Sequence, residues 1–337
     1  MDGMVPSVPF TVHHPPSTSL EPRMPTYKIQ HLTHYRYDRP VRESSNQIRI
    51  YPYQRPGQET IQHTLTITGE PSINRFIDYW GNQAGWFMVN EPCKQLVIDS
   101  NLLVKTYPTA QVPLATSKFA DWEVLRGASH NDMHLLDLSQ PETMQSGVAL
   151  RTMVAELQHV RDTPAMFIQR CSEYIFNNFT YRKGITTIET TLDEILELRS
   201  GVCQDFAHLL LQILRTEGMP ARYVSGYICP NQHDTRGAGA THAWVEVWLP
   251  VVGWMGIDPT NNCWVSDQHV TLAVGRHFGD CSPVKGTFKG PANQELSVSV
   301  SVAYEDGSRY EDHNLVQSGK EAVEVQQPEA GDGAQQQ

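Results

Sequence analysis

Three residue types that could together perform acyl transfer stand at positions 203, 242 and 258 of this 337-residue chain. A cysteine is a useful nucleophile only as the thiolate, which the unpaired N–H groups and positive dipole end of a helix start favour. Cys203 lies at such a start. His242 lies at the beginning of the strand-like segment THAWVEVWL and Asp258 ends the next one, so base and carboxylate can meet on neighbouring strands. This order predicts that His242 takes the thiol proton while Asp258 holds the imidazole by its other nitrogen.

The other cysteines give no sign of a reactive or metal-binding role. They form no Cys-x-x-Cys pair and no short repeated spacing, so neither a zinc knuckle nor a disulfide framework is indicated. We interpret them as small packed thiols, reduced as in cytoplasm, and expect a cytoplasmic protein. A metal-binding structural protein conflicts with the scattered histidines and cysteines. The five are Cys93, Cys171, Cys229, Cys263 and Cys281.

Helical patterns fill the segment that must position the nucleophile. Thr163 and Pro164 are typical of an N-cap and a first helical residue. A capping box at residues 191–194 starts a short helix that we expect to stop at Ser200-Gly201. Apolar residues then recur at helical spacing over residues 206–214, which predicts a central, mostly buried helix.

The flanking segments alternate with a period of two, as strands do. Residues 27–106 contain several such runs with turn signals between them and predict an all-β domain. Three strands follow Gly218, and the glycine-rich loop 231–241 joins the first two. The late segment LSVSVSVAY alternates over nine residues and predicts one more strand.

These patterns divide the chain into five parts. Residues 1–25 are rich in proline and lack the basic start and apolar run of a secretory signal, so we expect a disordered leader. An N-terminal β domain over 26–108 and a connecting segment with a helix over 109–160 precede the core at 161–305. Residues 306–337 are rich in Glu, Gln, Gly and Ala without apolar periodicity, which predicts a disordered acidic tail.

Composition limits the classes of partner. Lys and Arg total 26 against 37 Asp and Glu, and the net charge of −11 disfavours nucleic acid and anionic membrane surfaces. No stretch approaches the roughly 18 to 20 uninterrupted apolar residues that a bilayer crossing requires. We expect a soluble globular protein with neither a nucleic-acid nor a membrane partner. The oligomeric state is left open.

Two parts of the chain resemble a known family. GVCQDFAHLLLQILRTEGMPARYVSGY and THAWVEVWLPVVGWMGIDPTN look like the core of the bacterial transglutaminase-like cysteine peptidases, within the wider transglutaminase and papain-like superfamily. YKIQHLTHYRYDRPVRESSNQIRIYPY with DYWGNQAGWFMV is similar to the β domain that precedes that core. The resemblance implies Cys203 as nucleophile, His242 as base and Asp258 as orienter. It implies a thioester formed from a peptide or protein amide, with no metal and no organic cofactor.

The resemblance does not fix what resolves the thioester. Hydrolysis results when water attacks it and transamidation when an amine does. We favour a peptidase or isopeptidase-like amide hydrolase because water is always present, with a protein-glutamine transamidase on the same triad as the alternative. A non-catalytic peptide-binding module is the alternative from another class. The predicted fold is α+β, an N-terminal antiparallel β domain followed by a transglutaminase/papain-like core of helices and antiparallel sheet.

Four side chains near the triad allow more than one interpretation. Trp244 lies on the same strand face as the base and could wall a cleft or pack. Tyr181 could donate its hydroxyl to an oxyanion beside the N–H of Cys203, or pack in the core. Asp205 is interpreted as a first-turn carboxylate favoured by the helix dipole. For His208, one turn further, we expect no chemical role.

The triad makes one geometric demand on the hairpin between its two strands. Directly opposed residues of an antiparallel pair lie on one face, and side chains alternate along each strand. A two-residue turn at 251–252 would place Asp258 across from Val245 and His242 on the other face. We therefore predict a loop with an odd number of residues, or a bulge that restores the same parity, with five residues over 248–252 placing Asp258 directly across from His242.

Overall fold

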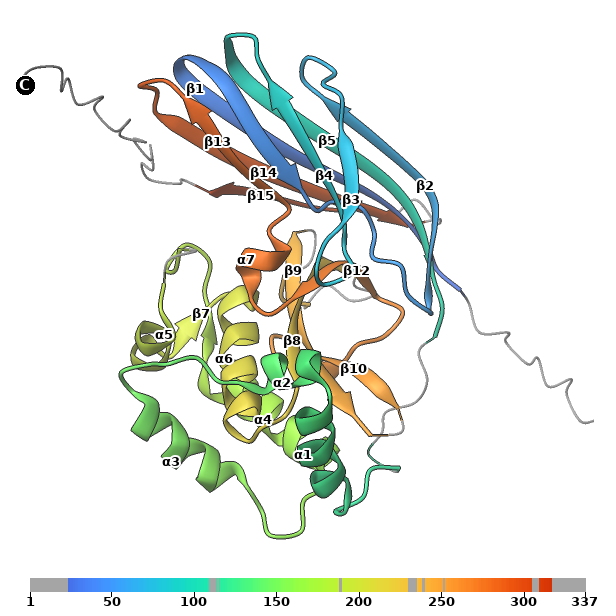
Figure 1. Cartoon of the computed structure of the whole chain (residues 1–337), viewed down its shortest axis with the longest axis vertical. Coiled ribbons are helices and arrows are strands. Elements are labelled where there is room, and N and C mark those ends of the chain that lie inside the picture. Colours follow the sequence, from blue (N-terminus) through green and yellow to red (C-terminus); the bar gives the residue numbers. More distant parts are fainter. Residues whose placement is uncertain are drawn as a thin grey trace, which may run out of the picture.

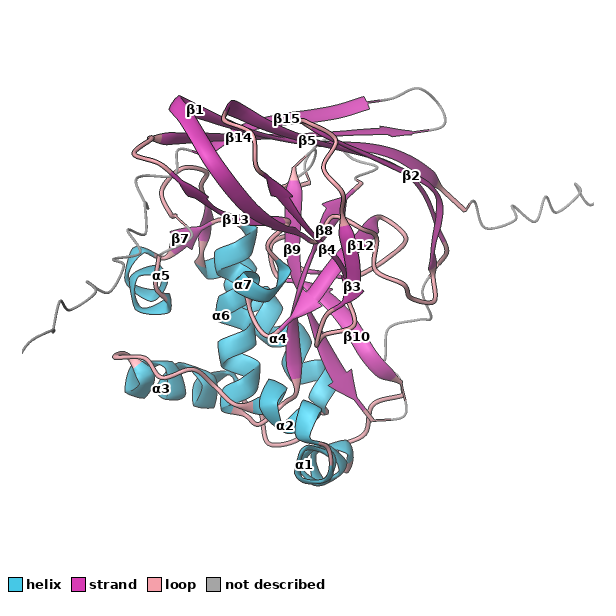
Figure 2. Cartoon of the chain, turned by 45° about the horizontal axis from the view of Figure 1, so that its top comes forward, coloured by secondary structure: helices cyan, strands magenta, loops and turns pink. Residues whose placement is uncertain are grey.

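The computed structural model describes residues 24–108, 114, 116–187, 190–229, 235–237, 240–250, 252–304 and 309–316, the last segment without its side chains. In the described part, an eight-stranded sheet spans the top of the molecule, above a helical region and a five-stranded antiparallel sheet (Figure 1). The helices lie on one side of the five-stranded sheet (Figure 2). This arrangement confirms the predicted α+β fold class.

The long strand β1 (Thr26–Ile48) organises the eight-stranded sheet. Its first half pairs with β5 (Cys93–Thr106) on one side and β14 (Gln294–Tyr304) on the other. Its second half pairs with β4 (Gln83–Val89) and β13 (Val284–Lys289). Alternate β1 side chains are buried, as a sheet with one covered face requires. The remaining strands are β2 (Gln58–Ile67), β3 (Asn74–Ile77) and β15 (Arg309–Val316).

The last strands correct the expected division of the chain. β13 and β14 fall within the stretch 161–305 that we assigned to the core, yet both pair with β1. β15 begins inside the expected disordered tail and pairs with β14. Alternation in LSVSVSVAY correctly indicates a strand, but alternation carries no information about which strand lies beside it. Residues 1–23 and 317–337 lie outside the described residues, so the leader and most of the tail stay predictions.

The five-stranded sheet of the core has the order β11-β10-β9-β8-β12. Helix α6 (Cys203–Thr216) packs on one of its faces, and α4 (Pro164–Asn178) packs on α6. Phe206, Leu210 and Ile213 of α6 are fully buried in the largest apolar cluster of the described chain. This confirms the expected central helix. The strands are β8 (Ala221–Ile228), β9 (Thr241–Leu249), β10 (Gly253–Asp258), β11 (Cys263–Trp264) and β12 (His269–Gly275).

Local capping signals set the helix boundaries. The Thr163 hydroxyl accepts the Met166 N–H at 3.3 Å, and both bonds of the predicted capping box of Thr191 and Glu194 are present. The helix that this capping box starts, α5, is followed by Arg199 in the left-handed conformation, φ 49°. It therefore ends slightly before Gly201, the residue that we expected to stop it. The other elements are α1 (Asp121–Asn131), α2 (Met133–Ser139), α3 (Gly147–Leu157), α5 (Leu192–Leu198), α7 (Phe278–Cys281), β6 (Thr180–Tyr181) and β7 (Ser200–Gly201).

A buried ion cluster joins the two sheets. Glu246 of β9 is fully buried and accepts hydrogen bonds from Arg222 of β8 at 2.7 Å and from Arg55, which precedes β2. The side chain of Asn82 pairs with the backbone N–H and C=O of Val274 at 2.8 and 2.7 Å, which covers part of the edge strand β12. These contacts fix the eight-stranded sheet against the core.

No helix within the described ranges is both long and apolar enough to cross a bilayer.

Candidate active site

The turn before α6 places Cys203 as the first helical residue, as the sequence predicts. Val202 is extended at the N-cap but has no side-chain acceptor, so Asp205 caps the turn by accepting the Val202 N–H at 2.8 Å. Its carboxylate also accepts the Thr186 hydroxyl at 2.7 Å. Burial raises the pKa of Asp205. Asp205 is thus a capping carboxylate that links the helix start to the preceding loop, which agrees with its interpretation from the sequence.

The hairpin β9–β10 brings His242 and Asp258 together. His242 Nε2 donates to Asp258 Oδ2 at 2.8 Å, and both side chains are 0% exposed. Three residues separate the strands, and the register pairs Gly253 with Leu249. The loop is therefore odd in length as predicted, but the expected five-residue loop is wrong. In the observed register Asp258 falls across from Trp244, on the same face as His242 and one diagonal step away, within reach of its ring.

Four hydrogen bonds hold the Asp258 carboxylate. Oδ1 accepts the backbone N–H groups of Thr260 and Asn261 at 2.9 and 3.3 Å. Oδ2 accepts His242 Nε2 and, at 2.7 Å, the side-chain Nδ2 of Asn261. Burial would raise the pKa of Asp258, but the charge and hydrogen bond of His242, with a contribution from His269, hold it well below the usual range. Asp258 is therefore a fixed, ionised acceptor.

The other nitrogen of His242 is left for the thiol. Nδ1 is buried and has no hydrogen-bond partner among the described residues. Burial lowers the pKa of the imidazole, but the charge and hydrogen bond of Asp258, together with the neighbouring Cys203, raise it to about 10. A protonated imidazole beside a cysteine is the arrangement that stabilises a thiolate. The three residues singled out in the sequence thus lie together in the structure.

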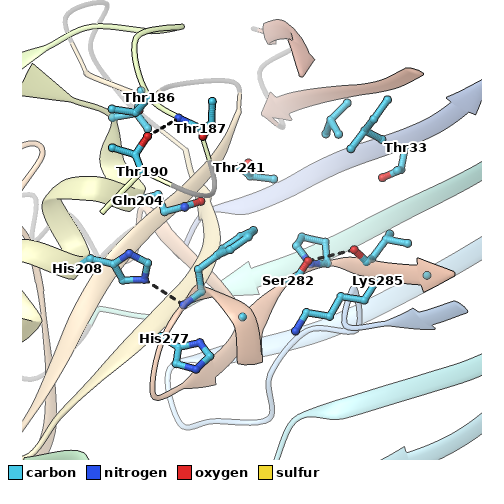
Figure 3. A pocket seen from close by; sticks show the side chains of 18 of the residues that line it. Thr33, Thr186, Thr187, Thr190, Gln204, His208, Thr241, His277, Ser282 and Lys285 are labelled. Carbon is cyan, nitrogen blue, oxygen red and sulfur yellow. Dashed lines mark hydrogen bonds between the residues drawn. The ribbon is translucent and has the colours of Figure 1, made fainter. Parts of the chain in front are cut away.

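Cys203 opens into a groove of about 2710 Å³ between the core and the eight-stranded sheet. Figure 3 shows Gln204, His208 and Thr241 on the core side, across from Thr33 and Lys285 on strands of the sheet. β1 and β14 form the roof above the nucleophile.

The other thiols differ from Cys203 in their surroundings. Within the described ranges none of them lines the groove. Burial raises the pKa of each one. These thiols are protonated at neutral pH and screened from solvent to different degrees, which leaves Cys203 as the candidate nucleophile. The five are Cys93, Cys171, Cys229, Cys263 and Cys281.

The neighbouring side chains divide between core and groove. Trp244 is 0% exposed and packs with Val224 and Val274, so of its two interpretations packing is correct and the cleft wall is not. Tyr181 does line the groove, and its role at an oxyanion stays a prediction. His208 accepts the Phe278 N–H at Nε2, 3.1 Å away, and burial lowers its pKa to about 4. His208 is therefore neutral and anchors the first residue of α7.

Three residues of the site were not singled out from the sequence. Asn261 contacts Asp258 from the turn after β10, and His269 Nε2 lies 3.6 Å from Asp258 Oδ2. Gly237 has φ +82°, and a Cβ added there would lie 2.6 Å from His242 Nδ1. The sequence signal for Gly237 was the glycine-rich loop itself, which we interpreted only as a connection. Asn261 lies three residues after Asp258, but its second partner, Arg236, is 25 positions away, and no local pattern places His269 beside Asp258.

Asp258, Cys263 and His269 form a group with the residue types of a metal site. Their ligand atoms lie within 4.8 Å of one another. However, His269 Nδ1 accepts the Ser266 N–H at 3.3 Å, which leaves the ring proton on Nε2. The Asp258 oxygens already accept four hydrogen bonds. Neither residue offers a free lone pair, so the group suits a hydrogen-bond network better than a metal ion.

Comparison with known proteins gives two family matches. Residues 151–259 match the family model of the transglutaminase-like superfamily, and residues 27–105 match that of the bacterial transglutaminase-like N-terminal region. An uncharacterized protein of Mycobacterium tuberculosis is 35% identical over 299 residues, covering 83% of this chain and 93% of that protein. A protein-glutamine gamma-glutamyltransferase of Pseudomonas aeruginosa is 30% identical over 132 residues, 35% of this chain and 19% of that protein.

One solved structure shares the fold over most of the chain. It is the crystal structure of a proposed cysteine protease from Cytophaga hutchinsonii, with a TM-score of 0.67 and 18% sequence identity. The match covers 89% of this chain and 95% of that one. Both the eight-stranded sheet and the core are therefore parts of a fold that another protein shares.

Proposed function

The chain belongs to the transglutaminase-like superfamily, and from this premise we propose that it is a cysteine-dependent amide hydrolase. Cys203 is the nucleophile, His242 the general base and acid, and Asp258 the group that orients the imidazole. The observation that carries the proposal is the placement of one buried imidazole, bonded to Asp258 at 2.8 Å and beside the only cysteine that, in the described ranges, lines the groove.

The reaction follows from the positions of these groups. The Cys203 sulfur attacks the amide carbonyl, and the oxyanion forms near the N-terminus of α6, where unpaired N–H groups can stabilise it. The imidazolium of His242 gives its proton to the leaving amine, and the thioester remains on Cys203. His242 then takes a proton from water, which attacks the thioester, and collapse of the intermediate releases a carboxylic acid and restores the Cys203 thiolate beside the His242 imidazolium.

The groove favours a peptide or protein substrate. Pockets for small molecules have volumes of roughly 300 to 1,000 Å³, and this groove is several times larger. An extended segment of polypeptide could lie along it with its amide at Cys203.

All six cysteines are free, which fits a reducing compartment such as the cytoplasm.

A protein-glutamine transamidase is the second candidate, and one observation favours it. The Pseudomonas aeruginosa relative that matches about a third of this chain is named as such a transferase. Chemistry at the thiol is the same until the thioester forms, and the two functions differ only in whether water or an amine resolves it.

A panel of glutamine-containing peptides, isopeptides and simple peptide amides would test the proposal. Each is incubated with the protein, and intact-mass spectrometry follows an acyl adduct on Cys203 while product analysis follows release of the amine. Parallel reactions contain a primary amine in excess. Free carboxylic acid with and without the amine supports a hydrolase, and an amide of the added amine supports a transamidase.

The variant C203A is the control. If C203A forms the same products at the wild-type rate, the proposed reaction at this site is wrong. If the wild type forms neither adduct nor product with any amide while binding peptides in the groove, the non-catalytic module replaces the enzyme.

A further inference from the structure

The side chain of Asn261 joins the orienting carboxylate to the loop that covers the base. Nδ2 donates one hydrogen to Asp258 Oδ2 at 2.7 Å and the other to the Arg236 carbonyl at 3.1 Å. Oδ1 accepts the Arg236 N–H at 2.9 Å. Exchanging the oxygen and nitrogen of the carboxamide would set its oxygen against two other acceptors, so the network fixes this orientation. Among side chains of this size, only asparagine supplies two such donors with an acceptor.

The same contacts hold the 235–237 segment of the glycine-rich loop close to His242. The Arg236 guanidinium stacks over the Phe176 ring of α4 at 4.2 Å, which anchors the loop at a second point. Gly237 follows, and its backbone lies so close to the imidazole that an added Cβ would be 2.6 Å from Nδ1. The imidazole is 0% exposed beneath it. Asn261 therefore contacts Asp258, which bonds to Nε2 of the imidazole. Through Arg236 it also holds the backbone of Gly237, which covers Nδ1 on the other side of the ring.

We propose that Asn261 is a positioning residue for the acyl-transfer reaction, acting on His242 through both Asp258 and the 235–237 segment. The proposal rests on the proposed function of Cys203 and His242. Asn261 keeps the Asp258 carboxylate aligned with His242 Nε2, and through Arg236 it holds Gly237 against the ring so that solvent stays out. Its loss should slow acyl transfer without removing the nucleophile.

The substitution Asn261→Asp gives a signature that a purely structural role would not produce. It keeps the shape of the side chain but replaces the Nδ2 donor by a carboxyl oxygen about 2.7 Å from Asp258 Oδ2. Two carboxylates at that distance cannot both ionise readily. The pair of Asp258 and the introduced aspartate therefore shares one proton, and the pKa for losing that proton is raised. Below that pKa the introduced carboxyl donates to Asp258 as the amide did, and above it the two groups repel. The other titratable or charged groups facing the position are His242, His269, Cys263 and Arg236.

The assay measures acyl transfer from p-nitrophenyl acetate from about pH 5 to 8. The rate of C203A is subtracted at each pH. The ratio of the N261D rate to the wild-type rate should fall about tenfold or more as the pH rises, as expected for loss of a hydrogen bond to a charged group. N261A lacks the donor at every pH, so its rate should be lower than wild type by a factor that does not change with pH.

The matched control is Asn262→Asp, which adds the same charge one residue later. Asn262 accepts a hydrogen bond from Gln169 at 3.3 Å, and aspartate tolerates its φ of 49°. N262D should follow the wild-type pH profile. Thermal unfolding of all variants at each pH identifies any that fail to fold. If N261D does not fold at high pH, the rate of N261A relative to wild type tests the proposal instead.

The outcomes separate this proposal from the proposed function. Wild-type turnover by C203A would overturn both. With C203A inactive, a constant N261D to wild-type ratio across the pH range would overturn the Asn261 proposal alone, as would wild-type turnover by folded N261A.

Discussion

Replacing Gly237 by alanine should disable the site while the protein stays folded. Gly237 has φ +82°, a conformation that favours glycine, and it lies directly over the imidazole of His242. The added methyl carbon would lie 2.6 Å from Nδ1 and 3.1 Å from Cε1 of the ring. A single methyl group therefore perturbs both the backbone and the base.

The two effects have different sizes. An L-residue in the left-handed region costs about 1 to 2 kcal/mol, which is a loss of stability that a folded protein of this size survives. Ordinary van der Waals contact begins at 3.4 Å, so methyl and ring must separate by about 0.8 Å. Displacements near 1 Å in a catalytic group can cost about 100-fold in rate. We expect a loss of stability of about 1 to 2 kcal/mol and a fall in acyl transfer of about 100-fold.

Gly218→Ala is the matched control. Gly218 has φ +74° after α6, and a Cβ there would meet nothing within 4 Å, so the variant carries the backbone cost alone. Urea unfolding compares the stability of both variants with wild type, and p-nitrophenyl acetate turnover compares their sites. The reasoning is refuted if G237A and G218A, equally destabilised, turn over at the same rate.

Three further predictions concern the thiols, the ion cluster and the triad. Iodoacetamide at about pH 6 should modify Cys203 first, because burial raises the pKa of the other thiols, and a peptide map in which Cys263 reacts as fast would contradict this. Glu246→Gln should cost about 3 to 5 kcal/mol in urea unfolding, because the buried guanidinium of Arg222 and the partly exposed one of Arg55 lose their charged partner. Burial opposes ionisation of Glu246, but Arg222 and Arg55 lower its pKa, so its stabilisation is complete above the ordinary pKa of 4.5 and lost as the pH falls further. The stability of E246Q should therefore vary less with pH in that acidic range, and an unchanged pH dependence would count against the assignment. H242A should abolish acyl transfer and D258N should leave a measurable remnant, whereas equal rates in D258N and wild type would remove Asp258 from the mechanism.

Local signals in the sequence were sufficient for the elements that carry the triad. Position 203 closely follows the end of a short capped helix and precedes an apolar helical stripe, and both features act over one or two turns. The capping box of Thr191 and Glu194 forms as the spacing predicts. The odd length of the loop between the His242 and Asp258 strands follows from side-chain alternation once the triad requires both residues to share one face of the hairpin.

Features that depend on distant partners could not be predicted in the same way. Alternation places Trp244 on the face of His242, but only the packing of Val224 and Val274 shows that this face is covered there. Asn261 acts through Arg236, which is 25 positions away in a loop with no periodicity. The register of the hairpin also differs from the direct opposition that we expected, because a diagonal contact suffices for an imidazole and a carboxylate.

Strand β1 is made first among the described strands, yet one of its long edges is completed only by β14, which pairs Tyr27 with Tyr304. During synthesis that edge stays unpaired until residues 294–304 have left the ribosome. Pairings so distant in sequence close slowly, and an open apolar edge invites association with other chains in the meantime. A fragment ending before residue 284 would retain Cys203, His242 and Asp258 but lack the strands beside β1 that roof the groove. The nucleophile is thus enclosed in its groove only after translation has passed the last strands of the sheet.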